Sequence, residues 1–193
     1  TDDRTVDNGQ NLTLSGSSYG VLRVNGSGSL TLAPTGSTPM LIKSLEGNSD
    51  TGTLILTAPG EYWIQNLQVQ LGNFKIYGSG DVVIYIQGNT TINSTMPTEI
   101  NTSTQRVGMI VYSQFTLNNA STLRAALYSA SGQTSINGNV YGPVTVASSL
   151  NVSSSSYWID GTPWTGFTNW GGDCLPIDHY EITYPTTTQV GQS

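Results

Sequence analysis

The sequence predicts an all-β solenoid, and the simplest form of it is a right-handed parallel β-helix. Three observations carry this prediction. Short apolar, strand-like clusters return about every 18 residues between Val107 and Val152. Polar corners rich in Gly, Asn, Ser and Thr separate them, and no segment has the period of a helix. Each cluster is too short to close a core alone, whereas stacked turns would bury all of them in one column. An antiparallel β-sandwich is the alternative.

The repeat alternates between strands and corners. The expected strands centre on Val107–Val111, Phe115–Leu117, Ala125–Leu127, Ile136, Val144–Val146 and Leu150–Val152. The corners between them are Asn118-Asn119, Asn137-Gly138-Asn139 and Gly142-Pro143. Gly and Asn tolerate positive φ and Pro fixes a turn, so these corners suit a chain that changes direction at regular intervals.

The upstream half contains the same kinds of strand-like apolar segments and polar corners, but they recur at less regular intervals. Leu12 and Leu14, like Leu30 and Leu32, alternate with polar residues, which predicts strands with one face inward. In the run Gly-Glu-Tyr-Trp-Ile-Gln, we expect Trp63 to belong to the core. The polar stretch 93–105 breaks the rhythm and predicts a loop that protrudes from one turn.

Composition excludes several classes of function. Charged residues make up 9% of the 193-residue chain, against about 25% in typical proteins, and the net charge is −6. The six basic residues are scattered at Arg4, Arg23, Lys43, Lys75, Arg106 and Arg124. Nucleic-acid binding needs a basic stripe, so we exclude it. No apolar run reaches the length of a membrane span, so we expect no membrane insertion, and no motif predicts a cofactor. A surface of hydroxyls and amides is typical of extracellular or cell-surface β proteins.

A cluster of large rings follows the last repeat. Its members are Tyr157, Trp158, Trp164, Phe167 and Trp170. One interpretation is a cap over the open apolar end of the solenoid. The other is a carbohydrate-binding patch, because flat exposed rings stack on sugar faces. We therefore expect a solenoid with an aromatic cap over residues 1–172, followed by a second segment over 173–193.

Cys174 is the only cysteine, so it is either a buried apolar side chain or half of a disulfide whose partner lies outside this chain. The stretch around it, Gly171 to Pro185, resembles a junction in MshQ-like proteins, bacterial surface proteins associated with mannose-sensitive haemagglutinin type IV pili. The matching residues are Cys174, Asp178, His179, Tyr180, Glu181 and Ile182. The specific part of the resemblance covers only this C-terminal end, and the repetitive β region upstream of it, as in Ile136–Val152, is similar in style to the Gly/Asn/Ser-rich segments of that family. The resemblance implies that 173–193 open an immunoglobulin-like β-sandwich or form a linker strand. A second cysteine that often follows in that family is missing here.

The resemblance implies an exported, cell-surface protein with a structural or adhesive role, and it identifies no ligand. Our hypothesis for the function is a non-catalytic module that acts as a rigid spacer or as a contact surface for glycans, matrix or pilus components. A carbohydrate-active β-helix enzyme, either a polysaccharide lyase or a glycoside hydrolase, is the main rival. A self-assembling filament subunit is the third hypothesis, because exposed end strands can pair.

The acidic residues stand in apparent turns without a repeated pair, so we predict no catalytic residues. We predict no metal site either. The N-terminal acids Asp2, Asp3 and Asp7 fit a frayed, solvated terminus better than a cation site. The threonines fall irregularly and predict no ice-binding ladder.

Overall fold

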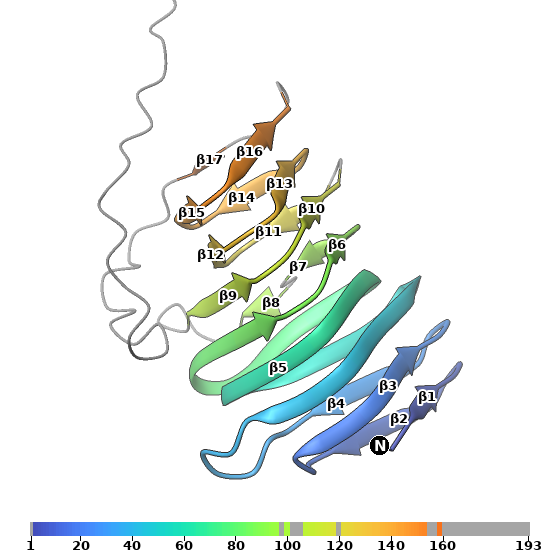
Figure 1. Cartoon of the computed structure of the whole chain (residues 1–193). Coiled ribbons are helices and arrows are strands. Elements are labelled where there is room, and N and C mark those ends of the chain that lie inside the picture. Colours follow the sequence, from blue (N-terminus) through green and yellow to red (C-terminus); the bar gives the residue numbers. More distant parts are fainter. Residues whose placement is uncertain (1, 97–98, 101–105, 119–120, 154–157, 160–193) are drawn as a thin grey trace, which may run out of the picture.

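The computed structural model describes residues 2–96, 99–100, 106–118, 121–153 and 158–159, and these form a β-solenoid (Figure 1). The strands pair in parallel, and the described residues contain no helix, hence none that could cross a bilayer. The predicted solenoid is confirmed and the antiparallel sandwich is excluded for this part of the chain. Residues 160–193, with the expected second segment, lie outside the described residues.

The first two turns each contain two strands. They are β1 (Arg4–Val6) and β2 (Asn11–Leu14), then β3 (Ser18–Val24) and β4 (Ser29–Leu32). β1 lies beside β3 and β2 beside β4, with Arg4 opposite Leu22 and Asn11 opposite Ser29. The turn length at this end of the solenoid is therefore the period that the C-terminal half predicted.

The middle of the solenoid is one extended segment, β5 (Met40–Ile86), which winds through successive turns (Figure 1). Leu22 lies opposite Leu45, and Ile84 lies opposite Met109. The second turn and the turns built from β5 are therefore longer than the first turn, which explains why the repeat is hard to recognise in this part of the sequence.

The last turns contain three strands each and return to the shorter period. The strands are β9 (Val107–Val111), β10 (Phe115–Leu117), β11 (Thr122–Leu123), β12 (Ala126–Ser129), β13 (Gln133–Ile136), β14 (Asn139–Tyr141), β15 (Val144–Val146), β16 (Ser149–Val152) and β17 (Trp158–Ile159). Leu127 lies opposite both Met109 and Val144, so the turns before and after it are almost equal in length. A small sheet of β7 (Thr95–Met96), β11, β14 and β17 forms the third side.

The prediction of a protruding loop over 93–105 is wrong in part. After β6 (Thr90–Ile92), the chain forms β7 (Thr95–Met96) and β8 (Glu99–Ile100). β7 pairs with β11 and β8 pairs with β5, so both belong to the wall of the solenoid. Met96 supplies the buried side chain of this turn, a contribution that the surrounding Ser, Thr and Pro obscured. Residues 97–98 and 101–105 lie outside the described residues.

The core is a column of inward side chains that lie over one another from turn to turn. Leu22 and Leu45 form part of one such column, and Leu67, Thr90, Phe115 and Thr134 follow one another in register over successive turns. All of them are buried, and each covers the next. This stacking shields side chains that no single turn could shield, which is the basis of solenoid stability.

Polar bonds between turns reinforce the ladder. The Arg23 guanidinium lies 2.6 Å from the Glu46 carboxylate on the next turn, and Arg106 forms a two-point contact with Asp81. Inside the core, the Tyr62 hydroxyl donates to the Thr57 carbonyl at 2.8 Å and lies 3.0 Å from that of Leu32. Burial raises the pKa of this hydroxyl to about 12, although the hydrogen bonds to Thr57 lower the pKa and so oppose part of the rise.

Candidate functional site

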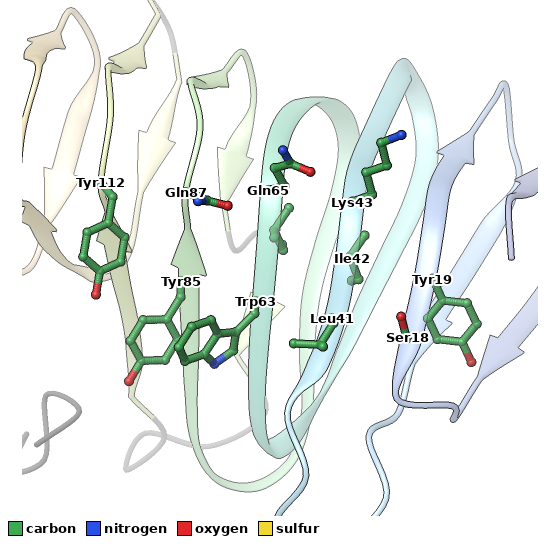
Figure 2. Close-up of a pocket in the computed structure, with 11 residues that line it drawn as sticks. Ser18, Tyr19, Leu41, Ile42, Lys43, Trp63, Gln65, Tyr85, Gln87 and Tyr112 are labelled. Carbon is green, nitrogen blue, oxygen red and sulfur yellow. The ribbon is translucent and has the colours of Figure 1, made fainter. Parts of the chain in front are cut away.

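A groove of about 680 Å³ crosses the outer face built from β3, β5 and the turn after β9 (Figure 2). The lining residues are Ser18, Tyr19, Leu41, Ile42, Lys43, Trp63, Ile64, Gln65, Tyr85, Gln87 and Tyr112. They come from successive turns, so the groove runs across the strands and along the solenoid axis. Its volume lies within the usual range for small-molecule sites, about 300 to 1,000 Å³.

Trp63 lies in this groove and not in the core, so the prediction for it is wrong. Its neighbours Tyr62 and Ile64 point inward and are buried, and Trp63 is therefore turned outward, with 47% of its surface exposed. The hydrophobicity of the indole by itself favours a buried position. Side chains alternate between the two faces of a strand, however, so burying Trp63 would expose both Tyr62 and Ile64.

The Trp63 ring packs on Tyr85 of the next turn, with ring centroids 4.8 Å apart and planes tilted by 31°. The backbone N–H of Gln87 donates to the Ile64 carbonyl at 2.9 Å, which fixes the register of these two turns. Tyr85 is only 9% exposed because the indole covers it. The indole N–H donates to the Glu61 carboxylate, which holds the ring in place.

The Tyr85 hydroxyl keeps its proton at neutral pH. Burial raises its pKa first, and the negative charges of Glu61 and ionised Tyr112 raise it further. The group therefore remains a hydrogen-bond donor and acceptor beside the indole.

Two rows of side chains run along the groove (Figure 2). The first contains Leu41, Trp63 and Tyr85, each from a different turn. The second row, two positions further along each strand, contains Lys43, Gln65 and Gln87 and continues to Tyr112. The backbone N–H of Tyr112 donates to the Ile86 carbonyl at 2.9 Å, which places this residue beside Gln87.

Three of these side chains expose nearly half of their surface. Leu41 is 49% exposed and Tyr112 is 46% exposed, close to the value for Trp63. The groove thus presents flat or branched apolar surface beside amide groups. No Asp, Glu or His occurs among the described lining residues, and the rings and amides present can make apolar contacts and hydrogen bonds.

Most of the ring cluster predicted from the sequence lies outside the described residues, namely Tyr157, Trp164, Phe167 and Trp170. Cys174 lies outside them as well. Trp158 is the one member of the cluster whose backbone is described. It belongs to β17, where it lies opposite Val140 and continues the small sheet by one turn. Both the cap and the C-terminal binding patch remain predictions.

The N-terminal acids do not gather around a cation site. Asp2 lies 2.6 Å from the Arg4 guanidinium, and Asp3 accepts the Val21 backbone N–H at 2.8 Å. Asp7 accepts from Asn25 at 3.0 Å. The terminus is paired with the second turn through β1 and is not frayed as expected. No group of three His, Cys, Asp or Glu able to hold a metal occurs among the described residues.

Threonine stacking is limited to pairs. Thr13 lies opposite Thr31, Thr91 opposite Thr116, and Thr95 opposite Thr122. Each pair ends at the following turn, where Ile55, Ser135 and Asn139 take the same positions. The described residues therefore contain short hydroxyl pairs and no extended threonine ladder.

Neither family models, curated proteins nor solved structures give a match to this chain. The groove is therefore interpreted from its own geometry. The sequence does contain a signal for the groove. A large apolar or aromatic residue is followed two positions later by a long polar residue, and this pattern starts at Leu41, Trp63 and Tyr85 with equal spacing. We did not predict the groove because this spacing is longer than that of the C-terminal repeat.

Proposed function

We propose that this chain is a non-catalytic contact module of an exported bacterial surface or pilus-associated protein, and that its groove binds glycans. One observation carries the proposal. Leu41, Trp63 and Tyr112 each expose nearly half of their surface in one continuous groove, beside the amides of Gln65 and Gln87.

Exposing large apolar side chains in a row is unfavourable in water. Each Å² of apolar surface that a ligand covers contributes about 25 cal/mol. Contiguous exposed patches of this kind mark binding surfaces more often than scattered single residues do. Aromatic rings bind the apolar faces of sugars, while amides and hydroxyls bind their hydroxyl groups.

The remainder of the fold suits a rigid support. Parallel ladders join each turn to the next, and charged pairs such as Arg23 with Glu46 and Asp81 with Arg106 span adjacent turns. A rigid support keeps groove residues from different turns at fixed separations, which lowers the entropy cost of binding.

The location and the partner class come from the sequence. Few charges, many hydroxyls and amides, and the MshQ-like junction support an extracellular setting in which glycans, matrix or pilus components are the available partners. A glycoside hydrolase would require two carboxylates facing its substrate, and the described groove lining offers none. Binding therefore ranks above catalysis for this groove.

A glycan array tests the proposal, with Trp63→Ala and Tyr112→Ala as variants and Tyr77→Ala as the matched control. Tyr77 is also an exposed tyrosine of the solenoid but does not line the groove. We expect each groove variant to weaken glycan binding about tenfold or more, a loss of about 1.4 kcal/mol, with little change in melting temperature. Unchanged binding in both groove variants, or an equal loss in Tyr77→Ala, would overturn the proposal.

A further inference from the structure

We infer that the groove takes a linear, neutral, β-1,4-linked polysaccharide that lies along the solenoid axis, with about one sugar unit per turn. This inference rests on the proposed function and specifies its ligand. It follows from the repeat distance of the turns, from the order of the side chains along the groove and from the charge of the lining.

The first argument is the repeat distance. Strands of successive turns lie about 4.8 Å apart, the spacing of any β-ladder. This distance is close to the length of one pyranose unit in an extended β-1,4 chain. A straight polymer of this kind can therefore meet an equivalent position on every turn without bending.

The second argument is the order of the exposed side chains. Trp63 and Tyr112 lie on turns that are separated by the turn of Tyr85, so they stand about two strand spacings apart along the axis. In a flat β-1,4 ribbon, successive sugars are rotated by half a turn, so every second sugar presents the same face. The two exposed rings have this two-sugar separation along the axis, with Trp63 in the first row and Tyr112 in the second, so they would contact the two edges of the ribbon, and the covered Tyr85 lies on the turn between them.

The third argument is the polar row. Gln65 and Gln87 stand beside Trp63 and Tyr85 on their own turns, and Figure 2 shows them between Lys43 and Tyr112 along the groove. A side-chain amide carries both donors and an acceptor, so it can bind the equatorial hydroxyls at the edge of the ribbon. One such group per turn again fits a ligand with one repeat per turn.

Charge complementarity favours a neutral glycan. Among the described lining residues, Lys43 is the only one that is charged at neutral pH, and it lies in the row beyond Gln65. The chain carries a net charge of −6, so its overall field repels polyanionic glycans. Uncharged rings and amides bind a neutral polyol without the cost of desolvating an ion.

Isothermal titration calorimetry with oligosaccharides of defined linkage tests the inference. The ligands are cello-oligosaccharides of increasing length, maltohexaose as the curled α-linked control, and a polyuronate as the anionic control. We expect affinity to rise about tenfold or more from the β-linked trimer to the hexamer, and maltohexaose and polyuronate to bind at least tenfold more weakly.

Two variants assign the effect to the groove. Trp63→Ala and Tyr112→Ala should each reduce the gain from trimer to hexamer, whereas Tyr77→Ala should leave it unchanged. Equal affinity for trimer and hexamer, or a preference for maltohexaose or polyuronate, overturns the β-1,4 inference but leaves glycan binding in place. Absence of binding to every glycan on the array overturns the inference and the proposed function together.

Discussion

Phe115 and Trp63 are large rings on opposite faces of the solenoid wall, and replacing each by alanine tests the outward placement of the tryptophan. Phe115 is fully buried in a core column, where its register partners are Thr90 and Thr134. Trp63 lies on the outer face and packs mainly on Tyr85. The two substitutions should therefore have very different effects on stability.

The magnitudes follow from burial. Phe115→Ala leaves a cavity between adjacent turns and should cost about 3 to 5 kcal/mol. Trp63→Ala loses one ring contact and part of its buried area, and should cost about 0.5 to 1.5 kcal/mol. Trp63→Phe retains a ring over Tyr85 and should recover most of that loss.

Urea unfolding followed by far-UV circular dichroism measures both variants, because this signal does not depend on the tryptophan that is removed. The midpoint of Phe115→Ala should fall clearly below that of the unmodified chain, and that of Trp63→Ala only slightly. If Trp63→Ala is as destabilising as Phe115→Ala, the indole belongs to the core, and the groove argument fails with it.

Two further predictions concern the interior and the packing of turns. The pKa of Tyr62 is about 12 in the folded chain against 10.0 when free, so the folded state holds this proton more tightly. The contribution of this group to the free energy of unfolding should be fully present below pH 10 and should fall by up to about 3 kcal/mol as the pH rises to 12. Tyr62→Phe should remove this part of the alkaline slope in urea titrations, and an unchanged slope would contradict the burial of the hydroxyl. A Cβ at Gly72 would lie 1.8 Å from the Asp50 carbonyl oxygen of the preceding turn, so Gly72→Ala should cost more than about 3 kcal/mol in thermal unfolding. Gly9→Ala, which strains a positive φ but meets open space, should cost about 1 to 2 kcal/mol, and equal losses would argue against tight stacking at Gly72.

The solenoid was predictable because its cause is local and repeated. Pairs such as Leu30 with Leu32 alternate with polar residues, and corners such as Asn137-Gly138 recur between short apolar clusters. The structure confirms the predicted period where Leu127 lies opposite Met109. The longer central turns were not predicted, because a turn can lengthen at its corners without changing the alternation along its strands.

The groove was not predicted, although its residues are visible in the sequence. Trp63 was assigned to the core because its hydrophobicity outweighed its position between Tyr62 and Ile64. Met96 was missed for the opposite reason, since a single apolar residue in a polar stretch gives no periodicity to recognise.

The sequence by itself determined that this chain stacks short β-strands into a solenoid, since alternation and turn residues act over a few neighbours. Only the tertiary structure decided which side chains meet across turns. Leu41, Trp63, Tyr85 and Tyr112 are well separated along the chain, and they form one surface because the register of parallel strands brings successive turns together. That register depends on the length of every turn, a property of the whole coil that no local pattern of residues specifies.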